Sequence, residues 1–170
     1  MPQLIRPTVA YRESYLQSLQ EAHAEGRLLH LDYDALSADF GAFVQELLDK
    51  EESEKVLPGR VPESIYWLVE DGTYIGRVSV RHMLNDYLWP VGGHIGYDIR
   101  PTERRKGYGK QILELALRKA RDLGLKQVLI TCDNDNIASQ KIIKANGGLF
   151  AGEYEVEEQE TPILHYRIDL

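Results

Sequence analysis

Hydrophobic positions change their spacing near residue 63, and this change separates a helical part of the chain from a part rich in strands. A short apolar strand is expected at residues 4–7. Apolar side chains then recur every three or four positions, which predicts one helix that ends at Gly26 and a second over about 36–52. Pro58 and Pro62 mark the segment 53–63 as a loop.

The second part of the chain alternates strands and helices. Residues 64–70 and 73–81 are rich in β-branched and aromatic side chains and flank Asp71-Gly72, which predicts a hairpin. The pattern then predicts a strand at 92–100, a helix at 109–123, a strand at 127–132, a helix at 136–145 and strands at 149–156 and 162–169. The order β-α-α-β-β-β-α-β-α-β-β predicts a single α/β (α+β) domain over residues 1–170. We expect a mixed central sheet of about seven strands with helices on both faces.

Composition and charge restrict the function. The chain has 170 residues, a net charge of −7 and one cysteine, Cys132, so an intrachain disulfide and a cysteine-rich metal site are excluded. The negative charge disfavours a general nucleic-acid binder. Apolar runs fall short of the roughly 20 residues that span a bilayer, and Met1–Arg6 lacks the apolar core of a signal peptide. We therefore expect a cytoplasmic protein that binds neither nucleic acid, nor membrane, nor metal.

A basic, glycine-containing turn interrupts this negative charge. Residues 100–110 carry five basic side chains and one acidic side chain, and Arg-Arg-Lys-Gly-Tyr-Gly at 104–109 lies between a predicted strand and a predicted helix. Backbone N–H groups at a helix N-terminus are unpaired, and the helix dipole favours an anion there. Gly107 and Gly109 lack the Cβ atoms that would hold a phosphate away from the backbone. The turn predicts a pyrophosphate site, whereas the five glutamates of 153–160 are expected to be solvated.

Two common nucleotide motifs do not fit this turn. A P-loop needs a glycine at the position of Arg104 and a serine or threonine at the position of Gln111. A dinucleotide-binding turn needs a third glycine where the chain has Ile112. Both readings are therefore disfavoured.

Two spaced motifs carry a family resemblance. Arg104, Gly107 and Gly109 match the pattern Arg/Gln-x-x-Gly-x-Gly/Ala after a strand, and Asn136-Ile137-Ala138-Ser139 matches Asn-x-x-Ala/Ser after the next strand. With these motifs the chain resembles the GNAT superfamily of acyl-CoA-dependent N-acetyltransferases, and a bacterial subgroup of predicted acetyltransferases within it. The resemblance implies direct transfer of an acetyl group from acetyl-CoA to an unknown primary amine in a ternary complex, and a homodimer is common in such folds.

The resemblance also implies which residues bind the cosubstrate. The backbone of the fourth strand is expected to pair with pantetheine at Asp98, Ile99 and Arg100. The N–H groups of the turn are expected to hold the pyrophosphate, with Arg105 or Lys106 near the ribose 3′-phosphate. Asn136 and Ser139 are expected beside pantetheine. The full expected set is Asp98, Ile99, Arg100, Arg104, Arg105, Lys106, Gly107, Tyr108, Gly109, Lys110, Asn136 and Ser139.

The candidate catalytic residues differ from those that are usual in the resembled family. The glutamate that the family often carries on the fourth strand is absent, and His94 and Asp98 share one face of that strand by alternation. A histidine titrates near neutrality, so His94 is the candidate base. The family's usual tyrosine acid falls at Ile143, which leaves Ser139, another tyrosine or water to protonate the thiolate.

The sequence leaves open which amine is the acceptor and whether the protein is catalytic. The acceptor pocket is expected from aromatic and polar side chains and glutamates that suit a cationic amine: Tyr33, Tyr66, Trp67, Arg81, His82, Asn85, Tyr87 and the glutamates near 155. Small amines and protein N-termini or lysines compete as acceptors. Ile143 and the missing glutamate also allow a non-catalytic module that senses acyl-CoA.

Overall fold

The computed structural model describes residues 1–157 and 159–170, so Glu158 of the acidic run lies outside the described residues. Its strands form two sheets, one in the order β1-β2-β3-β4 and one in the order β5-β7-β6. The strands are β1 (Gln3–Ile5), β2 (Glu63–Glu70), β3 (Thr73–Arg81), β4 (Ile95–Ile99), β5 (Gln127–Asp133), β6 (Leu149–Tyr154) and β7 (Ile163–Asp169). The α/β fold is confirmed; the described residues contain seven strands, and every pairing between them is antiparallel rather than mixed.

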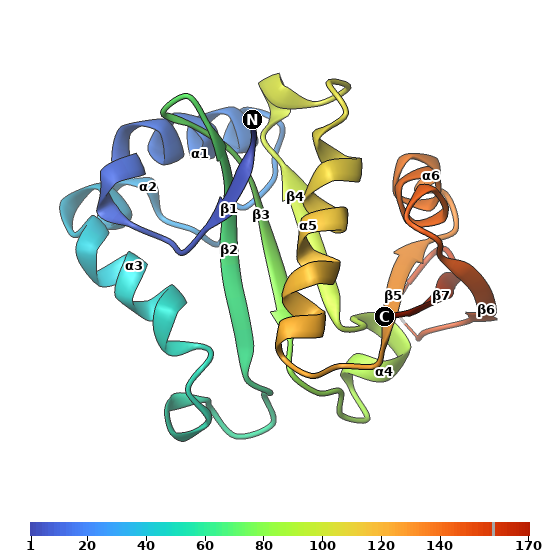
Figure 1. The fold of residues 1–170 in the computed structure, drawn as a ribbon. Helices are drawn as coiled ribbons and strands as arrows, with labels where there is room; N and C mark the ends of the chain where they lie inside the picture. Colours follow the sequence, from blue (N-terminus) through green and yellow to red (C-terminus); the bar gives the residue numbers. More distant parts are fainter. Residues whose placement is uncertain (158) are drawn as a thin grey trace.

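Six helices pack against the sheets. They are α1 (Arg12–Ala24), α2 (Tyr33–Ala38), α3 (Phe40–Asp49), α4 (Leu88–Val91), α5 (Tyr108–Asp122) and α6 (Ile137–Ala145), with 3-10 turns at Val9–Tyr11, Ser53–Lys55 and Pro101–Glu103. Helices α1–α3 and α5 lie on opposite sides of the first sheet (Figure 1). Within the described residues, no helix is long and apolar enough to cross a membrane.

Each face of the first sheet has its own core. On the side of α1–α3, Trp67 is fully buried and its ring stacks on Tyr15 at 5.0 Å between centroids. On the side of α5, the helix buries Ile112, Leu113 and Ala116 against the sheets. The two clusters confirm that helices cover both faces.

The expected second helix is two helices, α2 and α3. Asp39 has an extended φ of −141°, and its side chain accepts a hydrogen bond from the N–H of Ala42. Asp32 caps α2 in the same way, through the N–H of Ala35. An aspartate that caps a new N-terminus ends the preceding helix, and apolar spacing alone does not reveal this break.

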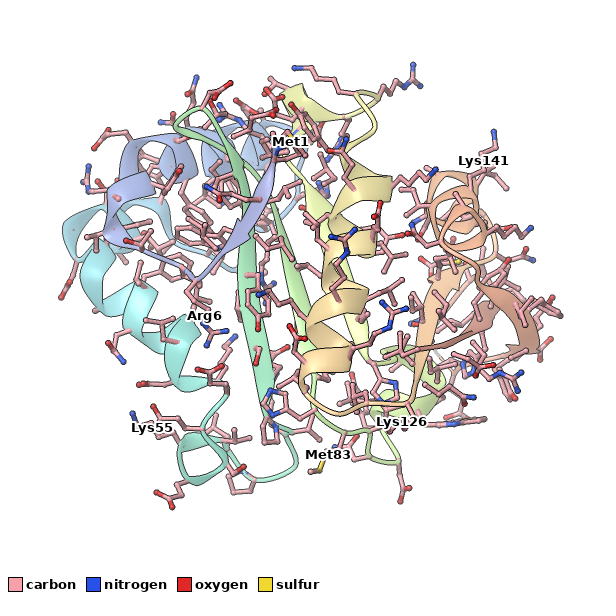
Figure 2. All side chains as sticks on the ribbon, viewed as in Figure 1. Met1, Arg6, Lys55, Met83, Lys126 and Lys141 are labelled. Carbon is pink, nitrogen blue, oxygen red and sulfur yellow. The ribbon has the colours of Figure 1, made fainter. Side chains whose placement is uncertain are left out.

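The single expected sheet is also divided. The described backbone pairs β4 with β3 on one side, while β5 pairs with β7. Strand β4 is therefore the edge of its sheet, and Figure 1 shows β4 and β5 separating beside α6. The loops that carry Met83 and Lys126 lie at one end of the molecule, and the turn before α5 lies at the other (Figure 2).

A buried ion pair joins α1 to the end of β4. The guanidinium of Arg100 is 6% exposed, and both its Nε and its Nη2 bind the carboxylate of Glu21 at distances of 2.6–3.0 Å. The hydroxyl of Thr102 also donates to Glu21, at 3.0 Å. The turn that follows β4 is thus anchored to α1.

Replacement of Glu21 tests this anchor. The Arg100 hydrogen bonds hold the pKa of Glu21 below its ordinary value, so the stabilisation is present above about pH 4.3 and is lost as the pH falls through the folded pKa. We expect Glu21→Gln to lower the free energy of unfolding by about 3 kcal/mol at pH 7, because Arg100 stays buried without a counter-charge. Urea denaturation between pH 3 and 7 measures both effects.

The matched control is Glu114→Gln. Glu114 pairs with Arg118 at 2.7 Å on the surface of α5, and both side chains are more than half exposed. Its loss should cost under about 1 kcal/mol. Equal effects of the two substitutions would contradict the anchoring role of Glu21.

Candidate functional site

Two hydrogen bonds between His94 and Leu129 join the sheets at the point where β4 begins. The N–H of His94 donates to the carbonyl of Leu129 at 2.7 Å, and the N–H of Leu129 donates to Nδ1 of His94 at 2.9 Å. Gly93 has a φ of +62°, and a Cβ there would lie 2.5 Å from the Leu129 carbonyl oxygen. Glycine is therefore required for this approach of the backbones. Beyond this junction the two strands part.

The edge of β4 that faces β5 has free backbone groups. On the side of β3, the backbone N–H of Arg81 donates to the carbonyl of His94, and the backbone N–H of Arg100 donates to the carbonyl of Ile75. Because residues of an antiparallel strand alternate in the direction of their backbone groups, Asp98 shares the β3 side with Arg100. Ile95, Tyr97 and Ile99 consequently present their N–H and C=O groups to the gap.

Two cavities meet in this gap, and both are lined by Tyr97, Asn136 and Ser139. The larger, the turn-side cavity, has a volume of about 680 Å³. It is lined by Arg27, Tyr97, Asp98, Ile99, Glu103, Arg104, Arg105, Gly107, Gly109, Lys110, Asn136, Ala138, Ser139 and Ile142. The smaller, the junction-side cavity, has a volume of about 320 Å³. It is lined by Arg81, Val91, Gly92, Ile95, Gly96, Tyr97, Thr131, Cys132, Asp133, Asn136, Ser139 and Ile163.

The turn-side cavity ends at the N-terminus of α5. Gly107 precedes the helix with a φ of +88°, and within the described residues no side chain caps this terminus. The first N–H groups of α5 therefore remain available to an anion. Gly109 has a different role from the expected one, because a Cβ there would lie 2.5 Å from Cδ1 of Ile142. Because glycine has no Cβ, α5 and α6 can pack closely at this position.

The basic side chains of the turn divide into two groups. Arg104 contacts the carbonyl of Ile99 at 3.3 Å and both oxygens of Glu25 at 3.0–3.1 Å, and Lys106 pairs with Glu103 at 2.9 Å. Arg105 and Lys110 line the turn-side cavity and have no ion pair within the described part of the chain. These two are the cations best placed to meet a polyanion.

Three members of the expected set do not line the cavity: Arg100, Lys106 and Tyr108. The hydroxyl of Tyr108 donates to Glu70 at 2.7 Å, and this bond raises the pKa of Tyr108 to about 12. Arg100 is wrong as a pantetheine partner, because its N–H already binds Ile75 and its guanidinium is buried on Glu21.

Asn136, Ser139 and Tyr97 come together where the cavities meet. Asn136 caps α6 by accepting a hydrogen bond from the N–H of Ser139 at 3.0 Å. The hydroxyl groups of Ser139 and Tyr97 are hydrogen-bonded at 2.8 Å, and burial raises the pKa of Tyr97 to about 12. Ile143, at the family's tyrosine position, is fully buried in the core. Tyr97 was missed from the sequence as a site residue, although strand alternation placed it opposite His94 and Asp98.

The geometry favours neither His94, the candidate base just before β4, nor Asp98, which shares its face. The Nδ1 lone pair of His94 is already occupied by the N–H of Leu129, which leaves the ring proton on Nε2. Burial and the charge of Arg81 lower the pKa of His94, so the ring is neutral. The carboxylate of Asp98 binds Arg27 at 2.8 Å. His94 thus connects the sheets, and this contact contradicts its prediction as the base.

The described residues contain no group of three or more histidine, cysteine, aspartate and glutamate side chains arranged to hold a metal. The turn-side cavity ends at an uncapped helix N-terminus, where the turn at 104–109 predicted an anion site. The family model of the acetyltransferase (GNAT) domain matches residues 15–148. The chain belongs to the GNAT acetyltransferase family.

Solved GNAT structures share the fold of this chain. The microcin C7 self-immunity acetyltransferase MccE, in complex with acetyl-CoA and AMP, has a TM-score of 0.73 and 15% identity, with 99% of this chain and 92% of that chain covered. The Salmonella typhimurium acetyltransferase that modifies the N-terminal serine of ribosomal protein L7/L12 has a TM-score of 0.68 and 15% identity, covering 99% and 95%. Mycobacterium smegmatis RimJ has a TM-score of 0.69 and 17% identity, covering 99% and 81%. No curated protein sequence matches the chain significantly.

Substitutions of His94 test the junction between the sheets. In His94→Ala the N–H of Leu129 loses its acceptor, so we expect the free energy of unfolding to fall by about 1–3 kcal/mol.

In His94→Asn the side-chain oxygen accepts the same hydrogen bond in place of Nδ1, but the asparagine side chain does not titrate. Because the folded pKa of His94 is lowered, the wild type should lose stability as the pH falls below about 6.5, and His94→Asn should lose less. Urea denaturation from pH 8 to 5 measures both, with His30→Asn, at an exposed histidine, as the control. Identical pH profiles of wild type and His94→Asn would contradict the assignment.

Proposed function

We propose that this GNAT protein is an N-acetyltransferase that moves an acetyl group from acetyl-CoA to a primary amine by direct attack in a ternary complex. The observation that carries the proposal is the turn-side cavity, which connects the open edge of β4 to the uncapped N-terminus of α5. That connection suits a molecule with a diphosphate at one end and an amide-containing arm at the other. MccE, which shares the fold, was solved with acetyl-CoA bound.

The residues would divide the ligand between them. The N–H groups of Gly107, Tyr108 and Gly109 would hold the pyrophosphate, and Arg105 and Lys110 would balance its charge. The free backbone groups of Tyr97 and Ile99 would pair with the pantetheine arm in the manner of an added strand. Arg104 would hold the turn in place through Glu25 and Ile99 rather than bind phosphate.

Acetyl-CoA supplies an activated thioester, and the acceptor nitrogen forms the new amide bond as the carbon–sulfur bond breaks. The Ser139 hydroxyl lies where the two cavities meet, so it is the group placed to give its proton to the departing sulfur. Tyr97, hydrogen-bonded to Ser139 at 2.8 Å, would replace that proton from its own hydroxyl. The high pKa of Tyr97 keeps this hydroxyl protonated at neutral pH. The ammonium loses two protons as its nitrogen becomes an amide: one leaves to solvent before the attack, and the second, lost as the amide forms, restores the hydroxyl of Tyr97 through solvent.

The acceptor amine would enter from the junction-side cavity, which shares Tyr97, Asn136 and Ser139 with the cosubstrate. A volume of about 320 Å³ suits a small molecule. A homodimer stays a prediction that a measured solution mass would test.

Gly107→Val tests the cosubstrate site. A β-branched residue is strained at a φ of +88°, so the turn should shift and its N–H groups should no longer converge. We expect acetyl-CoA to bind at least tenfold more weakly by isothermal titration calorimetry. Gly124→Val is the matched control, because Gly124 has a φ of +85° and open space around it but lies at the other end of α5. Unchanged affinity in Gly107→Val would refute the placement.

Tyr97→Phe and Ser139→Ala test the proton donor. Each should lower kcat by roughly 100-fold, the contribution typical of a general acid, while the Kd of acetyl-CoA changes little. Because the two hydroxyls act in one relay, the double variant should be no slower than the worse single variant. Tyr166→Phe, at a buried tyrosine on β7 outside both cavities, is the control. Additive losses, or a loss confined to KM, would contradict the relay.

A further inference from the structure

The junction-side cavity has two chemically different ends. At one end lie the hydroxyls of Tyr97 and Ser139, and at the other lies the guanidinium of Arg81 on β3. Gly96 also lines this cavity, and a Cβ there would meet no atom within 4 Å. The absence of a side chain at Gly96 therefore leaves open space beside β4.

The guanidinium of Arg81 is held in place by backbone carbonyls, and its ion pair with Glu63 is long. Its side chain is 22% exposed, and Nη1 donates to the carbonyls of Gly92 and Gly93 at 3.0 and 2.8 Å. The nearest carboxylate oxygen, Oε2 of Glu63, lies 4.0 Å from Nε, beyond hydrogen-bond distance, and accepts the hydroxyl of Ser79. Within the described residues Nε and Nη2 have no hydrogen-bond acceptor. The N–H groups of Nε and Nη2, which lie in the plane of the guanidinium, thus remain available to a ligand.

Arg81 has two other arginines and the carboxylate of Glu63 nearby. Burial is the main cause that lowers the pKa of Arg81; the charge of Glu63 opposes it, and the positive charges of Arg77 and Arg60 lower the pKa further. The Nε of Arg77 is itself buried without a partner among the described residues. A bound anion would relieve this concentration of positive charge.

We propose that the acceptor is a small primary amine that also carries a carboxylate or phosphate, with its anionic group on Arg81 and its amine toward Ser139. This inference rests on the proposed acetyl transfer and names its substrate class. Val80 pairs with Ile95 and Ser79 with Gly96, so the register places Arg81 opposite the residue before Ile95. Gly96 is two residues further along the strand, a distance of about 7 Å. The arginine side chain and a bound amino acid or aminoalkyl phosphate together span this distance.

This class differs from the cationic acceptor that the acidic run 153–160 suggested. None of the described glutamates in that run lines the junction-side cavity. Of the described residues that do line it, two are charged, Arg81 and the exposed Asp133. Arg81 is therefore the one cation among the described residues that line this cavity, and the more buried of its two charged side chains.

The first test uses the wild-type protein with acetyl-CoA and reads thiol release. The probes are the twenty proteinogenic amino acids, the matching amino-acid carboxamides, and phosphoethanolamine beside ethanolamine. We expect at least one anionic amine to exceed its neutral counterpart by tenfold or more in kcat/KM. The amino-acid and phosphoethanolamine arms distinguish a carboxylate from a phosphate. Equal turnover of the neutral counterparts, or no turnover with any anionic probe, would overturn the inference.

The second test changes Arg81. Arg81→Gln should lower kcat/KM for the best anionic probe by roughly 10- to 100-fold and remove its advantage over the neutral counterpart, while Arg81→Lys should retain part of it. Arg60→Gln is the control, because Arg60 lines a neighbouring cavity with Arg81 but not this one. Because the first test needs no variant, it decides the inference even if Arg81→Gln fails to fold.

Calorimetry separates this inference from the proposed function. If acetyl-CoA binds and neutral amines are turned over as well as anionic ones, the acceptor class is wrong and the acetyltransferase stands. If acetyl-CoA does not bind, the proposed function fails, and the acceptor class fails with it.

Discussion

The paired hydrogen bonds between His94 and Leu129 are the constraint on which the rest of the site depends. They hold β4 and β5 together at one end only, and beyond them each strand follows its own sheet. A strand paired on one side leaves half of its backbone groups unsatisfied, which is normally a liability in a soluble protein. Here that free edge lines a cavity, and we propose that the cosubstrate completes it.

The same strand connects the gap to the anion-binding turn. Arg100, directly after β4, is fixed to Glu21 on α1, and the chain then passes through the turn into α5. The position of the helix N-terminus relative to the open edge thus depends on this buried ion pair as well as on the contacts of Arg104 within the turn. A mobile turn would have to be ordered by the ligand, at a cost in conformational entropy. A turn anchored at its start avoids part of that cost.

The polar groups of the gap illustrate how the same residue types serve different purposes. His94 has the chemistry of a base, but its ring nitrogen is used to join two sheets. Tyr97 and Ser139 come from β4 and α6, and we propose that their hydrogen-bonded hydroxyls supply the proton that the family's tyrosine, absent at position 143, would give. Arg81 supports the loop before β4 through Nη1, and we propose that its other nitrogens bind the anionic group of the acceptor. The function we propose for each residue therefore depends on which of its polar atoms lack a hydrogen-bond partner within the described fold.

Local chemistry let the sequence by itself determine the order of the strands and of the long helices along the chain, the glycine turn before α5 and the family, but not the short helix α4. Helical periodicity, strand alternation and the left-handed φ at Gly107 depend on near neighbours in the chain. The break at Asp39 was missed because a cap depends on backbone geometry rather than on apolar spacing. The division into two sheets, the free edge at Tyr97, and the roles of His94 and Arg81 were decided only by the tertiary structure. Those features depend on contacts between residues far apart in the sequence, such as Tyr97 and Ser139, which are 42 positions apart, and no local pattern encodes which partners meet.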